Sequence, residues 1–243
     1  MKQDLEQKKP VEELPQGVLK EKKEDIKEIW KPKTLLGRKV KAGEITDIKE
    51  ILDNGLRIIE PEIVDILLPN LESTLLGIGQ SKGKFGGGKR SIWRQTQKKT
   101  KEGNKPTFST LTVIGNKEGY MGVGYGRAKE TVPAREKAMR KAKLNIIGIK
   151  MGCGSWACNC GENHSIPATI NGKCGSVRIK LIPAPRGTGL KVEKELQKIL
   201  LLAGIKDIYS RTSGQTRTKL NLMYACIDAL KNLNKLKIVE TKK

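Results

Sequence analysis

Three cysteines and the chain's single histidine lie within twelve residues of one another: Cys153, Cys158, Cys160 and His164. The spacing CxxxxCxCxxxH gathers three thiolates and an imidazole, close to the donor set of a closed tetrahedral zinc site, although paired CxxC motifs are commoner. Residues 152–163 contain almost no apolar side chain except Trp156. This segment therefore needs a cross-link of some kind to hold a fixed structure. The pattern predicts one structural Zn²⁺ that fixes the connection between two domains.

Two other interpretations of the cysteines stay open. Cys174 could replace His164 as the fourth ligand, although it lies in an expected strand. The thiols could also be reduced and partly buried without a metal, as we expect for Cys226 on its helix. Five cysteines, four of them crowded between 153 and 174, fit a reducing compartment better than a disulfide framework.

Catalytic patterns are weak in this sequence. Any Ser-His-Asp or Cys-His mechanism must use His164, and no carboxylate motif stands out to orient it. The segment 83–90, GKFGGGKR, nearly spells a phosphate-binding loop, but Arg90 supplies no hydroxyl for magnesium. The segment 122–126, GVGYG, lacks the spacing and acid of a dinucleotide fingerprint, so its glycines are expected to admit RNA or another strand. We therefore predict no enzyme and no small-molecule substrate.

The charge balance indicates a polyanionic partner. The chain carries 48 Lys and Arg against 26 Asp and Glu, a net charge of +22 over 243 residues. Positive charge is concentrated after residue 60, above all in the Gly-rich segment 79–105, which is expected to form a flexible basic loop. Because aromatic residues make up only 4%, phosphate contacts rather than base stacking should dominate binding.

The predicted RNA-binding residues are basic side chains of that loop, of the next helix start, and of the C-terminal strand and loop. They are Lys82, Lys84, Lys89, Arg90, Arg94, Lys98, Lys99, Arg127, Lys129, Arg178 and Arg186. Many other lysines are expected only to keep the protein soluble. No apolar run approaches the roughly 18–20 residues of a membrane helix, and the N-terminus lacks a signal pattern, so we expect a cytoplasmic protein without membrane contact.

The order of expected elements predicts an α+β chain. An N-terminal extension, 1–60, is expected to be partly disordered with a short helix at 46–53. A unit at 61–150 should contain a helix from 62 to 71, a hairpin of 107–114 with 120–125, and a helix over 128–147.

A second unit, 151–243, should begin with strands 164–170 and 174–182 around an Asn171-Gly172 turn. A stiff loop follows at 183–190, then a helix at 192–203 stopped by Gly204. The last expected elements are a strand at 205–209 and a helix at 220–236.

Several segments resemble a known family in the right order. Residues 172–189, GKCGSVRIKLIPAPRGTG, resemble the signature of the C-terminal domain of the small-subunit ribosomal protein five family, in its archaeal and eukaryotic wording. Residues 203–207, 108–126 and 128–130 are similar to further family segments, and the resemblance covers about 35–230. The related signature carries a cysteine at the position of Cys174 even without the upstream cluster, which favours a core role there.

The resemblance implies a double-stranded-RNA-binding-like domain followed by an α+β domain with a left-handed crossover. It implies binding to small-subunit rRNA, near the channel through which mRNA enters, beside small-subunit proteins two, three, four and eight, with influence on decoding accuracy. Residues 77–93 look lengthened against the family, so their RNA contacts cannot be carried over. Two alternatives are a free-standing double-stranded-RNA module serving a processing enzyme, and an RNA-modifying or nucleotide-using enzyme.

Overall fold

The computed structural model describes residues 30–81, 83 and 90–236. The predicted RNA contacts Lys82, Lys84 and Lys89 lie outside these residues, as does most of the segment expected to be disordered. Within the described part the chain is α+β, with two sheets and six helices. None of those helices combines the length and apolarity needed to span a bilayer.

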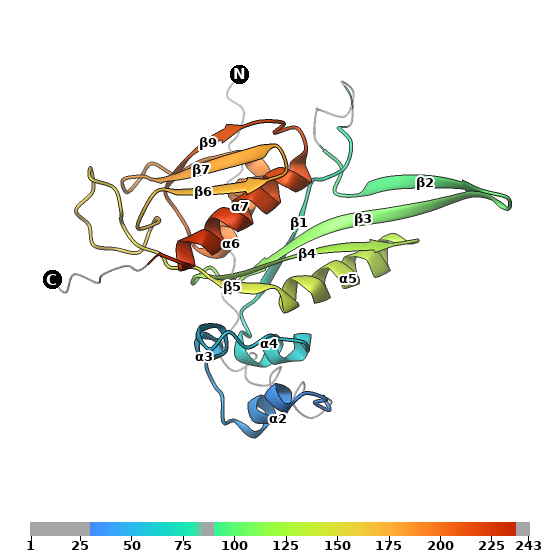
Figure 1. Ribbon diagram of the computed structural model, residues 1–243, viewed down its shortest axis with the longest axis horizontal. Helices are drawn as coiled ribbons and strands as arrows, with labels where there is room; N and C mark the ends of the chain where they lie inside the picture. The colour runs from blue at the N-terminus through green and yellow to red at the C-terminus, as the bar shows by residue number, and fades with distance from the viewer. Residues whose placement is uncertain (1–29, 82, 84–89, 237–243) are drawn as a thin grey trace, which may run out of the picture.

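The first sheet is antiparallel and has the order β1-β3-β4-β5, with β2 paired to the free half of β3. Its strands are β1 (Glu72–Leu76), β2 (Arg94–Thr100), β3 (Gly103–Gly115), β4 (Tyr120–Ala128) and β5 (Ile146–Gly148). The predicted hairpin of β3 and β4 is confirmed. The hairpin of β2 and β3 projects away from the rest of the molecule in Figure 1.

The expectation of a flexible loop is wrong for β2. Its residues, RQTQKKT, pair with β3 along their whole length, from Arg94 opposite Ser109 to Thr100 opposite Gly103. Six of its seven residues are exposed, so the strand shows no alternation of buried and exposed positions. Hydrophobic periodicity therefore carried no signal for it.

Helix α5 (Thr131–Leu144) lies against β4 through small residues on both elements. A Cβ atom on Gly124 would lie 2.1 Å from the carbonyl oxygen of Ala138. The same relation pairs Gly122 with Ala142 and Gly126 with Ala134. These glycines admit a helix, which corrects the expectation that they admit RNA or a strand.

The second sheet has the order β6-β7-β9-β8. Its strands are β6 (Ile170–Cys174), β7 (Val177–Pro183), β8 (Leu190–Lys191) and β9 (Ile208–Ser213), and its helices are α6 (Lys194–Ala203) and α7 (Lys219–Asn234). Strand β8 pairs parallel with β9, and α6 connects them. The strand expected at 174–182 is observed as β7, and the predicted Gly204 stop of α6, with φ of 93°, is confirmed.

The predicted turn at Asn171-Gly172 is wrong, because both residues lie inside β6 and the chain turns at Gly175, where φ is 60°. A Cβ on Gly172 would lie 2.1 Å from the carbonyl oxygen of Ala225 in α7. The glycine is needed for this helix contact, and the expected strand at 164–170 is reduced to its last residue, Ile170.

One hydrophobic cluster joins the two sheets. It combines Leu111 and Met121 of the first sheet with Ile179 of the second and Leu196 of α6. A Cβ on Gly115 of β3 would lie 2.3 Å from the carbonyl oxygen of Leu202, so α6 packs closely on the first sheet. The first sheet is therefore covered by α5 on one face and by the second unit on the other.

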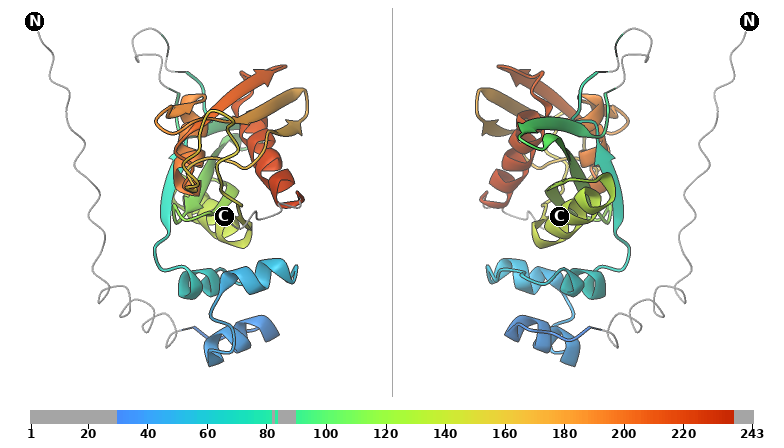
Figure 2. Two further views of the ribbon diagram at one scale, coloured as in Figure 1. Left: turned by 90° about the vertical axis from the view of Figure 1, so that its left-hand side faces the viewer. Right: turned by 90° about the vertical axis from the view of Figure 1, so that its right-hand side faces the viewer.

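Three short helices form a further layer beside the first sheet (Figures 1 and 2). They are α2 (Leu35–Ala42), α3 (Ile48–Asp53) and α4 (Pro61–Leu67). Their buried residues, including Val40, Ile51 and Ile63, form a second cluster with Trp30, Ala142 and Ile146. The predicted helices at 46–53 and 62–71 are confirmed, but the second ends at Leu67. Ile146, expected in a helix, is in β5 because α5 ends at Leu144.

The close contact of β4 and α5 predicts an asymmetric response to Gly→Ala substitution. Gly124→Ala should lower the free energy of unfolding by about 3 kcal/mol, because the new methyl meets rigid backbone. Gly148→Ala, whose Cβ would meet only side chains at 3.5 Å or more, should change it by less than about 1 kcal/mol. Urea unfolding of both variants checks this, and equal losses would contradict the packing argument.

Candidate metal centre and basic surfaces

The four predicted ligands come together in the irregular segment between β5 and β6. Their donor atoms all lie within 4.8 Å of one another. The Sγ atoms of Cys158 and Cys160 are 3.2 Å apart, and the Nε2 atom of His164 is 3.8 Å from Cys158 Sγ. Three sulfurs and one imidazole nitrogen at this separation can hold a metal ion.

His164 is held in place by a carboxylate that the sequence analysis did not find. The ring is 4% exposed, and its Nδ1 atom lies 2.9 Å from Oδ2 of Asp207. A metal-binding histidine typically donates its other ring N–H to such a carboxylate, which turns the free nitrogen toward the metal. Asp207 follows His164 by 43 residues, so no local spacing could have indicated it.

Asp207 also connects the cluster to the loop 183–190. Its Oδ1 atom accepts a hydrogen bond from the backbone N–H of Gly189 at 2.8 Å. The backbone N–H of Lys206 donates to the carbonyl oxygen of His164 at 2.9 Å. On the surface, Arg186 pairs with Glu162 at 2.9 Å. The cluster is thus attached to the second unit at several points.

The electrostatics of the thiols differ from one residue to the next. The backbone N–H of Arg186, followed by contacts from Cys160, lowers the pKa of Cys158 to about 6. Burial and hydrogen bonds to the neighbouring thiols raise the pKa of Cys153 to about 11. Thiols must lose their protons before they can bind a metal ion.

The other two cysteines lie outside the cluster. Cys226 is fully buried on α7, and burial raises the pKa of its thiol to about 12, which confirms the core interpretation. Cys174 ends β6 and packs, partly buried, against the same core. His164, rather than Cys174, completes the set of donors.

The predicted RNA-binding residues of the first unit lie around the sheet's projecting end, on both of its faces. Arg94 and Arg127 both lie opposite Ser109 of β3, one on each neighbouring strand. Lys98 and Lys99 continue along β2, and Lys129 is exposed just before α5. This set gathers exposed cations along the hairpin.

Three predicted residues lie elsewhere. Arg90 is half-buried and donates to the carbonyl oxygen of Gly79, so it has a structural contact. Arg178 is exposed on β7, and Arg186 is exposed in the loop 183–190. The structure therefore divides the predicted residues between two surfaces, and does not bring them into one.

Comparison with known families gives the class of the protein. Residues 92–150 match the family described as ribosomal protein S5, N-terminal domain, and residues 172–243 match ribosomal protein S5, C-terminal domain. These matches define a ribosomal protein.

Curated relatives match over nearly their whole length. The chain is 51% identical to the small ribosomal subunit protein uS5 of Nanoarchaeum equitans, over 87% of this chain and 90% of the relative. It is 48% identical to the protein of the same name from Methanocaldococcus jannaschii, over 88% of this chain and 92% of the relative. With Methanococcus maripaludis C6 the identity is 45%, over 92% and 91%.

The chain belongs to the uS5 family of small ribosomal subunit proteins. The resemblance to this family, in the form found in archaea and eukaryotes, is thereby confirmed. Since the family consists of structural proteins of the ribosome, the chain has a structural role in the small subunit and is not an enzyme.

The buried position of Asp207 predicts a loss of stability that does not depend on metal. Asp207→Ala should lower the free energy of unfolding by about 1–3 kcal/mol for each buried donor left without a partner. Glu162→Ala removes an exposed pair, with side chains 56% and 64% exposed, and should cost less than about 0.5 kcal/mol. Urea unfolding in the presence of a chelator measures both changes. A similar loss in both variants would show that Asp207 does not hold the segment.

Proposed function

We propose that the chain is a non-catalytic scaffold that binds the backbone of folded small-subunit rRNA through basic surfaces on its two units. The observation that carries this proposal is the β2–β3 hairpin, where Arg94, Lys98 and Lys99 are exposed on a strand that buries almost nothing. Such a strand adds little to the core, so its cations are available for contact. These side chains can recognise the phosphates and the overall shape of an RNA helix. They cannot reach the base edges in its deep groove, which is too narrow for side chains to enter.

We also propose the finer architecture that the family resemblance implies. The order α4, β1, β3, β4, α5 supports a double-stranded-RNA-binding-like unit over 61–150. The parallel pair β8 and β9, connected by α6, is where the left-handed crossover of a unit at 151–243 would lie. The shared cluster between the sheets speaks against the alternative of a free-standing module that needs no second unit.

The proposed position is the cytoplasmic small subunit, near the channel through which mRNA enters. There the chain would contact mRNA and the small-subunit proteins two, three, four and eight, and would support subunit assembly and decoding accuracy. The family membership and the basic surfaces support this position.

We propose zinc as the ion of the cysteine-histidine cluster. Three sulfurs and a carboxylate-oriented imidazole suit tetrahedral Zn²⁺ better than hard cations, which prefer oxygen ligands. The segment has no apolar core of its own, because its large apolar side chain, Trp156, is 100% exposed. The ion would supply structural stabilisation, with Cys153, Cys158, Cys160 and His164 as ligands.

Charge reversal on the hairpin tests RNA binding. The variant Arg94→Glu, Lys98→Glu, Lys99→Glu should bind a small-subunit rRNA transcript more weakly, with a log–log salt slope lower by about 2–3, because each lost phosphate contact removes roughly 0.7–0.9. Filter binding at several salt concentrations measures the slope. The matched control reverses three exposed cations of the N-terminal layer, Arg38, Lys39 and Lys49. Equal effects of the two variants would mean that the hairpin makes no specific contribution.

Metal analysis tests the zinc proposal. The purified chain should contain about one zinc per molecule, and Cys158→Ser should reduce this content. Cys174→Ser is the matched control and should retain the ion, because Cys174 lies outside the cluster. Chelation should loosen residues 152–165 to hydrogen exchange while both sheets stay protected. A metal-free protein whose exchange does not respond to added zinc would rule the site out.

A further inference from the structure

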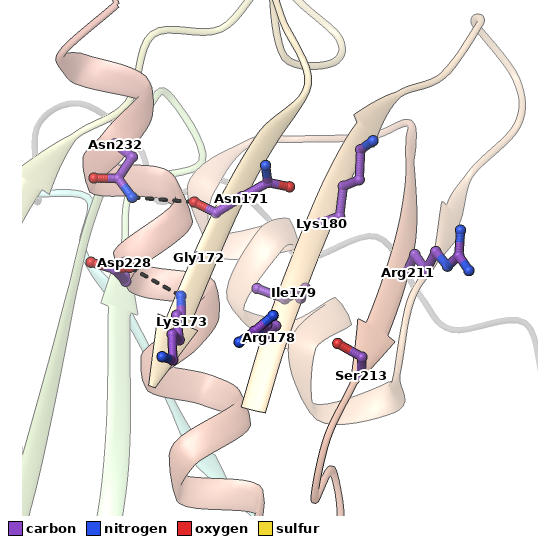
Figure 3. A pocket seen from close by; sticks show the side chains of 10 residues that line it. All are labelled: Asn171, Gly172, Lys173, Arg178, Ile179, Lys180, Arg211, Ser213, Asp228 and Asn232. Carbon is purple, nitrogen blue, oxygen red and sulfur yellow. Dashed lines mark hydrogen bonds between the residues drawn. The ribbon is translucent and has the colours of Figure 1, made fainter. Parts of the chain in front are cut away.

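The outer face of the second sheet carries cations in direct register across its strands. On β7, Arg178 and Lys180 point away from the core. Lys173 of β6 lies opposite Arg178, and Arg211 of β9 lies opposite Lys180. Figure 3 shows these side chains on three neighbouring strands. Of the four, the sequence analysis singled out only Arg178.

This arrangement works against folding. Like charges directly opposite each other on neighbouring strands are destabilising. Among the described residues, no ion pair includes any of these four cations. The carboxylate beside them, Asp228, accepts a hydrogen bond from the backbone N–H of Lys173 at 3.1 Å and so caps the sheet edge. Within the described part of the chain, these cations therefore have no carboxylate partner.

The same residues line an open groove of about 500 Å³, which neutral polar residues complete: Asn171, Ser213 and Asn232. A second groove of about 420 Å³ shares Lys173, Arg178 and Ser213 and continues past the turn at Gly175. The two grooves are neighbours, because they share these three residues. At the next outward position of β9, Tyr209 is 41% exposed.

We propose that this face binds the sugar–phosphate backbone of an RNA strand, as a second RNA-binding surface separate from the β2–β3 hairpin. The proposal rests on the proposed function, because it assigns a surface to RNA binding. A polymer with repeating charge can neutralise two rows of cations, whereas a single small anion reaches only one or two of them. The polar side chains of the groove suit ribose hydroxyls and phosphate oxygens.

The face is less suited to a protein partner. Stable protein interfaces centre on a desolvated core of large apolar and aromatic side chains, with charged residues at the rim. Here four cations occupy the centre, and Tyr209 lies beyond them. A cluster of exposed cations is typical of phosphate binding. The affinity of such binding is high at low salt and falls steeply as the salt concentration rises.

Neutralising the four cations tests the proposal in the full chain. The groove variant is Lys173→Gln, Arg178→Gln, Lys180→Gln, Arg211→Gln. The control is Arg38→Gln, Lys39→Gln, Lys49→Gln, Arg57→Gln, which removes the same number of exposed lysines and arginines elsewhere. We expect the groove variant to lower the log–log salt slope for small-subunit rRNA by about 3, since four contacts count for roughly 0.7–0.9 each. The control should leave the slope unchanged.

Thermal melting separates a binding defect from misfolding. The groove variant should melt at the same temperature as the wild type or higher, because it removes like-charge pairs. A slope equal to that of the control overturns the proposal for this face. If wild-type protein binds the transcript and only the hairpin variant is impaired, the proposed function stands while this inference fails. If wild-type protein binds no RNA, both fail.

Crosslinking identifies the occupant in assembled particles. With RNA that contains 4-thiouridine, irradiation of small subunits should yield nucleotide-linked peptides from residues 171–180 or 209–213. Crosslinks from these strands to an acidic protein or to a second copy of the chain, without nucleotide adducts, would replace RNA as the occupant and overturn the proposal.

Discussion

Close contact between helices and strands, made possible by glycine, is the constraint on which the fold depends. A Cβ on Gly124 would meet α5 at 2.1 Å, a Cβ on Gly172 would meet α7 at 2.1 Å, and one on Gly115 would meet α6 at 2.3 Å. The contacts are with carbonyl oxygens, which cannot move aside as a side chain can. Two small sheets with only 4% aromatic residues therefore bury a continuous core because their layers lie so close. Space, and not a positive φ, requires glycine at these positions.

Because the inner faces supply this core, the outer faces are free to carry charge. Strand β2 is exposed along nearly its whole length, and the outer rows of β6, β7 and β9 place Lys173 against Arg178 and Lys180 against Arg211. Neither arrangement stabilises the folded chain, and the second opposes it. These exposed cations thus lie where they affect packing least. The second sheet tolerates its charged face because α7 packs closely on the other face.

Local pattern predicted the elements whose signal lies in their own residues. Strand β7 and helix α7 were predicted correctly because burial on one side leaves a period in the sequence. Glycines were misread at Asn171-Gly172 and in β4, since a glycine that admits a helix looks the same in one sequence as a glycine that turns the chain. Strand β2 was missed because a strand exposed on both faces has no hydrophobic period.

The candidate metal centre shows the same division between local and distant information. Its four candidate ligands lie within twelve residues, so their spacing alone suggested that they come together, whereas Asp207 is brought to His164 only by the fold. That carboxylate also connects the site to a neighbouring loop. Its second oxygen accepts a hydrogen bond from the backbone N–H of Gly189, in the loop that carries Arg186. The backbone N–H of Arg186 in turn lowers the pKa of Cys158. The candidate ligands are therefore connected to the loop 183–190 as well as to their own segment. The cluster belongs to the architecture of the second unit as well as to the segment that joins β5 to β6.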